Sequence, residues 1–131
     1  ESPSGLAIDN KNHLLCSSCE EHLVVVNYEN RQIVAALPIA KGCDGVSFDT
    51  KSNMVFASTG SGILSDYLVK SKNDVIALEG IKTESGARTV TLDPNTGKVY
   101  VPTSEFGVAV DKNARRLPLK ENTFHILEIG K

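Results

Sequence analysis

The stretch Gly45-Val46-Ser47-Phe48-Asp49 decides the fold, because the chain carries two close counterparts of it. The counterparts are Gly5-Leu6-Ala7-Ile8-Asp9 and Thr89-Val90-Thr91-Leu92-Asp93. The closing aspartates recur at a spacing of about 40 to 45 residues, and self-similarity at a period of roughly 20 to 50 residues is typical of stacked supersecondary units. The sequence therefore predicts a repeat architecture, with repeats at about residues 4–41, 42–85 and 86–131.

Each copy of the stretch is followed by a polar turn and then by short runs rich in Val and Ile. Such runs between Gly, Asn, Asp and Pro residues predict strands, and no long window places apolar residues at the helical spacing. We expect four antiparallel strands in each of the first two repeats and three in the last, which lacks its fourth. The expected strands are Gly5–Asp9, His13–Cys19, His22–Glu29 and Gln32–Ile39, then Gly45–Asp49, Met54–Thr59, Ile63–Lys70 and Asp74–Thr83, then Ala87–Asp93, Lys98–Ser104 and Thr123–Gly130.

Composition agrees with an all-β fold and excludes several classes of function. A chain of 131 residues is long enough for one domain that buries a core. The net charge of −2 and the scattered Lys and Arg residues give no electrostatic footprint for nucleic acid, so a nucleic-acid partner is not expected. No apolar stretch approaches the roughly 20 residues of a membrane span, and Glu1-Ser2-Pro3 has no feature of a signal peptide.

Several segments resemble the YncE-like (YVTN-type) β-propeller repeat proteins. The segments are Ser4–Asp9, Val24–Asn27, Ile33–Ile39, Gly86–Thr89 with Leu92–Pro94, and Val99–Thr103. The resemblance implies an all-β propeller whose repeats are four-stranded blades, and it implies a periplasmic or secreted location. It also likens Phe124–Lys131 to the C-terminus of such proteins, in which an N-terminal strand completes the last blade. This chain is thus expected to be the C-terminal part of a longer propeller.

The expected ring is incomplete, since closed propellers use about four to eight blades and this chain has about three. Both outer sheet faces would then lack a neighbour, and large exposed apolar patches are rare on monomers. Three explanations stay open. The remaining blades of a larger ring cover these faces, a second copy of the chain completes a six-bladed ring, or the three-bladed chain is a stable monomer with rearranged edges.

Ser4, Asp44 and Arg88 occupy equivalent positions at the entrance to the first strand of each repeat. In a propeller these positions would ring the mouth of the central channel, where small ligands often bind. Asp44 and Arg88 come from adjacent repeats, and the forked guanidinium of Arg can hold a carboxylate. Two interpretations of this pair remain, an ion pair between repeats and a set of contacts to a polar ligand.

Cys19, His22 and Cys43 are candidate metal ligands. Cys19 and His22 flank a two-residue turn and are expected as cross-strand neighbours at about 5 Å, and Cys43 falls on the same face in the next repeat. Cysteine and histidine are common ligands of zinc. A Cys19–Cys43 disulfide and ordinary buried thiols are the alternatives, and the odd number of cysteines leaves the redox compartment undetermined.

Other polar residues are expected to have structural roles. Asp9, Asp49 and Asp93 should cap turns, because a residue type that recurs in every repeat fits structure better than a single site. His125 is expected to pack within a strand. The long stretch 106–122, with Arg115 and Arg116, is an exception, because a loop of this length is usually functional or disordered.

No enzymatic motif is present: the sequence has no Gly-x-Ser-x-Gly elbow, no glycine-rich phosphate loop and no His-Glu-x-x-His. We therefore expect a non-enzymatic binding or scaffold protein that takes a small ligand or a protein partner at the channel mouth. No cofactor can be assigned. The alternative is a propeller lactonase-like hydrolase with a metal site in the channel. YncE-like proteins also include DNA binders, a role that the balanced charge disfavours.

Overall fold

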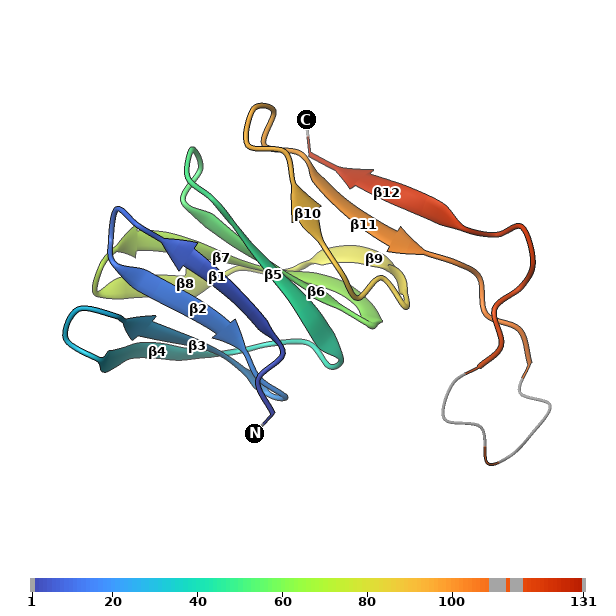
Figure 1. Ribbon diagram of the computed structural model, residues 1–131, viewed down its shortest axis with the longest axis horizontal. Coiled ribbons are helices and arrows are strands. Elements are labelled where there is room, and N and C mark those ends of the chain that lie inside the picture. Colours follow the sequence, from blue (N-terminus) through green and yellow to red (C-terminus); the bar gives the residue numbers. More distant parts are fainter. Residues whose placement is uncertain (1, 109–112, 114–116, 131) are drawn as a thin grey trace.

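The computed structural model describes residues 2–108, 113 and 117–130 of the chain. These residues contain no helix, hence none that could cross a membrane, and their strands form three antiparallel sheets of four, five and three strands (Figure 1). The sheets do not close into a barrel or a ring within the described ranges. The strands are β1 (Gly5–Asp9), β2 (Leu14–Ser18), β3 (His22–Asn27) and β4 (Gln32–Pro38), then β5 (Cys43–Asp49), β6 (Met54–Thr59), β7 (Ser61–Ser71), β8 (Asp74–Ala77) and β9 (Ile81–Ser85), then β10 (Thr91–Leu92), β11 (Val99–Thr103) and β12 (His125–Ile129).

The strands of each sheet fall within one of the three repeats expected from the sequence. The first sheet has the order β1-β2-β3-β4, the second contains β5-β6-β7-β8 with β9 also paired to β7, and the third has the order β10-β11-β12. The all-β class is confirmed, and among the residues that the structure describes the third sheet has three strands. Ser61 and Gly62, which lie between two of the expected strands, belong to β7.

The prediction of one continuous strand over Asp74–Thr83 is wrong, because two strands share that edge of β7. β8 pairs with the later half of β7, and β9 pairs with its beginning. Gly80 separates them with a φ of 85°, a left-handed conformation that favours glycine. Its N–H donates to Asp66 Oδ1 at 2.8 Å, so a side chain on the partner strand satisfies the backbone at the break.

The first strand of the third sheet is also shorter than expected. We expected a strand over Ala87–Asp93, but β10 contains only Thr91 and Leu92. The β10–β11 register, continued, places Thr89 opposite Pro102, which has no N–H to donate. Upstream, Arg88 N–H donates to the Gly86 carbonyl at 2.8 Å. The backbone before Thr91 therefore makes turn contacts in place of a strand ladder.

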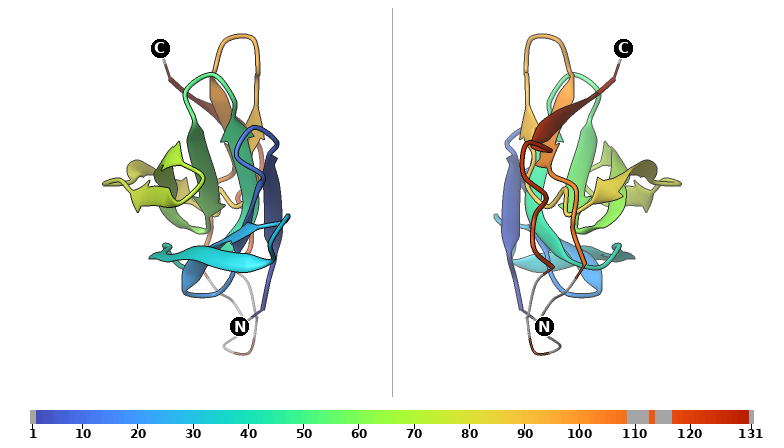
Figure 2. Two further views of the ribbon diagram at one scale, coloured as in Figure 1. Left: turned by 90° about the vertical axis from the view of Figure 1, so that its left-hand side faces the viewer. Right: turned by 90° about the vertical axis from the view of Figure 1, so that its right-hand side faces the viewer.

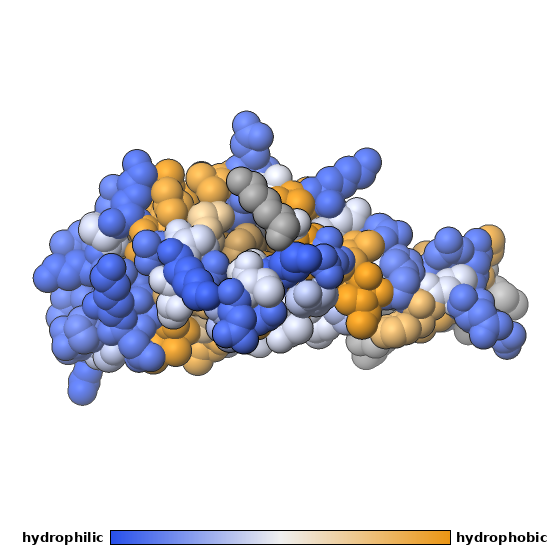
Figure 3. All heavy atoms as spheres, turned by 90° about the horizontal axis from the view of Figure 1, so that it is seen from above, coloured by the Kyte–Doolittle hydropathy of each residue, from blue (hydrophilic) through white to orange (hydrophobic). Residues whose placement is uncertain are grey.

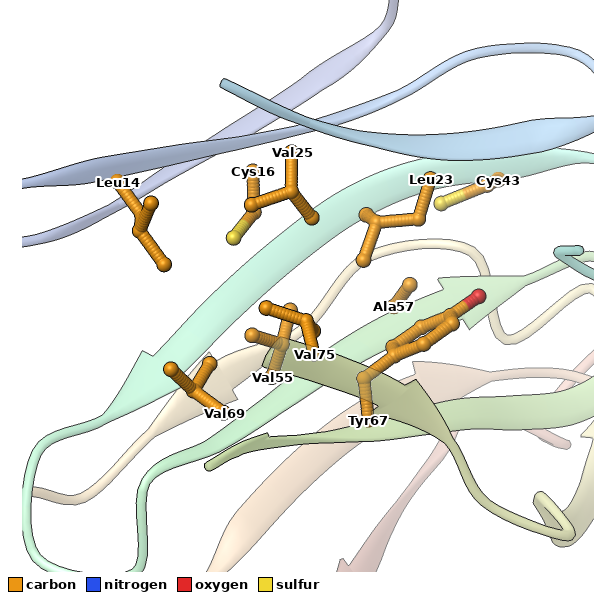
Figure 4. Packing of buried hydrophobic residues seen from close by; sticks show 10 residues of the cluster. All are labelled: Leu14, Cys16, Leu23, Val25, Cys43, Val55, Ala57, Tyr67, Val69 and Val75. Carbon is orange, nitrogen blue, oxygen red and sulfur yellow. The ribbon is translucent and has the colours of Figure 1, made fainter. Parts of the chain in front are cut away.

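The larger core lies between the first and second sheets. Figure 4 shows side chains of β2 and β3 pointing toward those of β6, β7 and β8. Alternation along β2 and β3 buries every second side chain, as a period of two requires of a half-buried strand. The buried residues of this core, all labelled in Figure 4, are Leu14, Cys16, Leu23, Val25, Cys43, Val55, Ala57, Tyr67, Val69 and Val75.

A smaller core joins the second sheet to the third. Its buried members are Leu64, Ala87, Val99 and Val101. Partly buried side chains of the second and third sheets pack around them, including Phe56, Val90 and Leu127. The second sheet thus has a hydrophobic neighbour on each of its faces.

The first strands of the three sheets lie alongside one another, and two glycines allow their close approach. Figure 2 shows these strands from two sides, with β1 in blue, β5 in green and β10 in orange. A Cβ atom on Gly5 would lie 2.8 Å from Val46 Cγ2, and one on Gly45 would lie 3.1 Å from Val90 N. Any larger residue at these two positions would push neighbouring sheets apart.

The three repeated aspartates cap turns, as the sequence predicted. Asp9 Oδ1 accepts hydrogen bonds from the N–H groups of the following turn, and the same is true of Asp49 and Asp93. A second oxygen accepts from an Asn, Ser or Thr side chain three residues on. The hydrogen bonds to the turn after Asp93 hold the pKa of that carboxyl below its usual value.

Removing a buried turn cap should lower the free energy of unfolding. Asp49 is 4% exposed, so Asp49→Ala leaves the Lys51 N–H and the Ser52 hydroxyl without this acceptor at a cost of about 2 kcal/mol. Asp49→Asn keeps an acceptor oxygen and should cost less. Urea denaturation measures both, and equal losses for Ala and Asn would contradict the capping role.

Gly45→Ala tests the close approach of the first strands. The new Cβ would lie 2.9 Å from Ser58 Oγ and 3.1 Å from Val90 N, and the backbone can yield only by separating the sheets. We expect a loss of about 1 to 3 kcal/mol, the usual cost of overpacking. Gly107→Ala is the control, because its Cβ would meet nothing closer than 3.5 Å. A small effect in both variants by urea denaturation would refute the contact.

Candidate functional site

A hollow of the described surface lies at the junction of the second and third sheets. It is an open pocket of about 510 Å³, within the range of small-molecule sites. The second sheet contributes residues near the ends of β5, β6 and β9, and the third repeat contributes the segment before β10 and the segment after β11. The lining residues are Asp44, Gly60, Ser85, Gly86, Arg88, Thr89, Phe106, Leu117 and Leu119.

Arg88 and Asp44 form an ion pair across the pocket, which confirms the interpretation of these residues as a pair between repeats. Arg88 Nη1 lies 3.8 Å from Asp44 Oδ2, and both side chains are about half exposed. This distance is longer than a hydrogen bond, and exposed pairs of this kind contribute only about 0 to 1 kcal/mol. The ion pair therefore adds little to the free energy of unfolding, and both charged groups remain accessible from the pocket.

Two glycines on the pocket wall lie under the side chains of Arg88 and Phe106. A Cβ on Gly60 would lie 3.0 Å from Arg88 Nε, so the arginine side chain lies flat against this glycine. A Cβ on Gly86 would lie 2.4 Å from Phe106 Cζ, so the aromatic ring covers that glycine. Gly60 N–H donates to the Gly42 carbonyl at 2.8 Å, and Gly86 N–H donates to the Gly60 carbonyl at 2.9 Å. These backbone hydrogen bonds thus hold the two glycines that lie under Arg88 and Phe106, which both line the pocket.

The apolar side of the pocket comes from the long segment after β11. Phe106 and Leu119 form an antiparallel bridge. Gly107 N–H donates to the Pro118 carbonyl at 2.7 Å, and Lys120 N–H donates to the Glu105 carbonyl at 2.9 Å. The two ends of the long loop are therefore paired like a hairpin, and they contribute Phe106, Leu117 and Leu119 to the pocket lining. Arg115 and Arg116, singled out in the sequence, lie outside the described residues.

Ser4 belongs to a neighbouring pocket rather than to the pocket of Arg88. Its hydroxyl donates to the Cys43 carbonyl at 2.6 Å and lies 3.1 Å from Ser18 Oγ. Together with Asp44 it lines a second hollow of about 400 Å³. The structure thus joins Asp44 with Arg88 and gives Ser4 a contact that ties the first sheet to the second.

The cysteine and histidine candidates are not gathered into a metal-binding group. No three His, Cys, Asp or Glu side chains of the described ranges are placed to hold a metal ion. The Cys19 N–H donates to the His22 carbonyl at 2.8 Å, so the expected two-residue turn is present. Cys43 is buried, and its thiol donates to the Gly45 carbonyl at 3.4 Å.

All three cysteines are free thiols, so the Cys19–Cys43 disulfide alternative is wrong for this structure. Burial raises the pKa of Cys43, and burial together with Asp9 raises the pKa of Cys16 to about 12. A thiol with a raised pKa is a poor nucleophile and a poor metal ligand. Cys16 and Cys43 are therefore core residues, which agrees with the interpretation as ordinary buried thiols.

Sequence reasoning missed Gly60, Gly86 and Phe106. Gly60 falls between two of the expected strands, and Phe106 was included only as the start of a long loop. One signal pointed toward the site, since a structureless loop of that length is usually functional when it is ordered. Nothing in the sequence pairs Phe106 with Gly86, because the contact depends on how the loop folds back over the second sheet.

His125 on β12 contacts Glu84 on β9, so it joins the third sheet to the second. Its Nδ1 lies 2.7 Å from the Thr123 carbonyl oxygen, and its Nε2 lies 2.8 Å from Glu84 Oε2. Both ring nitrogens face acceptors, an arrangement that suits the doubly protonated imidazolium. These two contacts, the Thr123 carbonyl first, raise the pKa of His125. His125 is thus partly exposed and hydrogen-bonded, not packed as the sequence suggested.

The His125–Glu84 contact should make the stability of the junction between the second and third sheets depend on pH. Because the pKa of folded His125 is raised, its stabilising contribution is complete below the unfolded-state pKa of about 6.5 and is lost as the pH rises through the folded-state value. NMR titration of the imidazole should show a lower pKa in Glu84→Gln than in the parent chain. Glu79→Gln, in the connection between β8 and β9, is the matched control. An unchanged titration in Glu84→Gln would contradict the assignment.

The fold and the site define an all-β protein of three sheets packed face to face, with a pocket that is charged on one side and apolar on the other.

No family model and no curated protein matches the chain. Solved structures do resemble its fold. The chain aligns with the hydrazine synthase of Kuenenia stuttgartiensis at a TM-score of 0.70 and 12% identity, covering 82% of this chain and 31% of that one.

Two further structures are similar. Luciferin-regenerating enzyme aligns at a TM-score of 0.60 and 14% identity, covering 98% of this chain and 45% of that one. The computationally designed Ika4 protein aligns at a TM-score of 0.61 and 12% identity, covering 99% of this chain and 92% of that one. This chain spans less than half the length of the first two proteins. Identities this low bear on the fold alone.

Proposed function

We propose that the three sheets are blades of an incomplete β-propeller of YncE-like type, and that the pocket at Arg88 binds a small ligand without catalysing a reaction. The repeated register and the alignment of β1, β5 and β10 support the propeller class, because propeller blades place their first strands around a common axis. An exported location remains a prediction from the same resemblance.

One observation carries the binding proposal: a loosely paired Arg88 and Asp44 face an apolar wall in one open pocket. A ligand with one positive and one negative group can satisfy both side chains at once. The guanidinium of Arg88 binds a carboxylate through two parallel N–H donors, while Asp44 accepts hydrogen bonds from an ammonium group. The ligand class that fits is an amino acid or a similar zwitterion with an apolar side chain.

The apolar wall gives the third contact of this ligand. Phe106 is held against Gly86, and Leu117 and Leu119 remain 49% and 62% exposed beside it. Covering such side chains releases about 25 cal/mol for each Å² of apolar surface removed from water. The same contacts disfavour a ligand without an apolar group, because the charge pair alone is weak and solvated.

The test is calorimetric titration of the chain with L-phenylalanine. Two matched probes remove one charge each: phenylalanine amide lacks the carboxylate, and 3-phenylpropionate lacks the ammonium. We expect Arg88→Gln and Asp44→Asn each to weaken phenylalanine binding about tenfold or more, equivalent to at least about 1.4 kcal/mol. Arg31→Gln, in the β3–β4 turn, is the control and should bind as the parent chain does.

Two results would count against this function. If the parent chain binds none of the three probes, the pocket does not take this ligand class. If it binds phenylalanine but Arg88→Gln binds equally well, the ligand lies elsewhere. No specific observation favours the lactonase-like alternative, since the described residues offer no group of three side chains that could hold a channel metal.

A further inference from the structure

A short hairpin stem carries the apolar wall of the Arg88 pocket. The stem consists of residues 105–107 and 118–120, which pair through an antiparallel bridge and two backbone hydrogen bonds. Its Phe106 ring covers Gly86, which lies on the floor of the pocket. A shift of the stem would therefore move the wall of the pocket relative to its floor.

Thr123, shortly before β12, holds both strands of this stem. Its hydroxyl donates to the Lys120 carbonyl at 2.7 Å and accepts a hydrogen bond from the Glu105 N–H at 3.0 Å. The charged side chains of the same two residues lie across the stem from each other, with 3.8 Å between Lys120 Nζ and Glu105 Oε2. Through Thr123 the stem is thus joined to the start of β12.

His125 joins the stem to the floor of the pocket. Its Nδ1 lies 2.7 Å from the Thr123 carbonyl oxygen, and its Nε2 lies 2.8 Å from Glu84 Oε2. Glu84 precedes Gly86 by two residues, and its carbonyl accepts a hydrogen bond from the Ala87 N–H at 3.2 Å. One imidazole ring therefore connects the segment that carries the wall with the segment that forms the floor.

Both contacts of His125 together require a protonated ring. The two contacted atoms are acceptors, and only the imidazolium carries a hydrogen on each nitrogen. A neutral ring loses one donor, and the lone pair of that nitrogen then faces an oxygen atom. The Thr123 carbonyl and then the Glu84 carboxylate raise the pKa of His125, and the Glu105 carboxylate adds to the effect. Lys120, which pairs with Glu105, is the cation of the stem, so the surrounding charge favours the protonated form.

We propose that His125 positions the apolar wall of the Arg88 pocket and thereby makes ligand binding depend on pH. The imidazolium holds the hairpin stem and the end of β9 together, so Phe106 stays over Gly86 and the pocket keeps its shape. When the ring becomes neutral, one of its two contacts is lost, the wall loosens and the affinity falls. The positioning role rests on the hydrogen bonds, whereas its effect on affinity rests on the function proposed above.

The sign of the effect follows from the direction of the pKa shift. Because the pKa of His125 is raised in the folded chain, binding is strongest below the ordinary imidazole value of about 6.5 and weakens as the pH rises through the folded-state value. Ligand binding should raise the pKa of His125 in turn, since a coupling between two sites is reciprocal.

The size of the effect follows from the exposure of the contact. Hydrophilic residues make up much of the surface seen in Figure 3, and the side chains of His125 and Glu84 are 36% and 48% exposed. Water screens charged contacts of this kind, so we expect the affinity to fall about threefold, and at most about fivefold, as His125 loses its proton.

The first experiment follows the wall without ligand, by NMR of the full chain from about pH 5 to about pH 8.5, a range that contains the ordinary imidazole value. The nuclear Overhauser effect between the Phe106 ring and the Gly86 Hα protons reports the contact of wall and floor. It should weaken as the pH rises, with the same midpoint as the titration of the His125 imidazole. Glu84→Gln removes the carboxylate but keeps an acceptor oxygen, so both midpoints should move together to lower pH.

The second experiment measures L-phenylalanine binding by calorimetry at the same pH values. The affinity of the parent chain should fall about threefold with the midpoint of His125. His125→Gln leaves every other titrating group in place, including those of the ligand, so its affinity should lack this step and stay near the high-pH level of the parent chain. His13→Gln is the matched control and should keep the parent profile, because His13 contacts Tyr28 in the first repeat.

The outcomes separate this inference from the proposed function. If phenylalanine binds at no pH, the proposed function fails and the Overhauser measurement alone decides the role of His125. If the Phe106–Gly86 contact stays constant while His125 titrates, the positioning role is overturned and the proposed function stands. A His125 that only stabilises the fold would lower the stability of His125→Gln, but Glu84→Gln would then leave the midpoint of the phenylalanine affinity unchanged, which also overturns the proposal.

Discussion

The close contact between the first strands of neighbouring sheets is the constraint on which the rest of this structure depends. Gly5 and Gly45 permit it, since a Cβ at either position would meet the next strand at 3.1 Å or less. Hydroxyl groups then fix it: Ser4 donates to the Cys43 carbonyl, and Ser58 donates to the Arg88 carbonyl. The spacing of the sheets, and hence the two cores between them, follows from these few contacts.

The same constraint positions the pocket. Because the Arg88 carbonyl is held by Ser58 of the preceding sheet, the Arg88 side chain emerges at the junction and lies over Gly60. Its ion pair with Asp44 adds little stability, so the charges can exchange partners without a large loss in the free energy of unfolding. The Arg88 side chain is thus a weakly paired cation above a backbone that hydrogen bonds hold in place.

The third repeat departs from the other two in several residues and strands beside the Arg88 pocket. It has Thr89 in place of glycine and Pro102 in place of serine, and its sheet has three described strands where the other two have four and five. Pro102 leaves β11 without a donor opposite Thr89, which shortens β10 and frees the segment around Arg88 to line the pocket.

The sequence by itself determined the three sheets, most strand positions and the role of Asp9, Asp49 and Asp93. These features are local: side chains alternate along a strand with a period of two, and a turn aspartate bonds to residues two and three positions on. The sequence also paired Asp44 with Arg88, because the alignment of the repeats places these two residues at equivalent positions in adjacent sheets. Tertiary structure alone decided that Gly86 lies under Phe106, that β8 and β9 share one edge, and that the cysteines stay apart. Those contacts depend on how separate sheets and a long loop pack against one another. No local sequence pattern encodes contacts between residues so far apart in the chain.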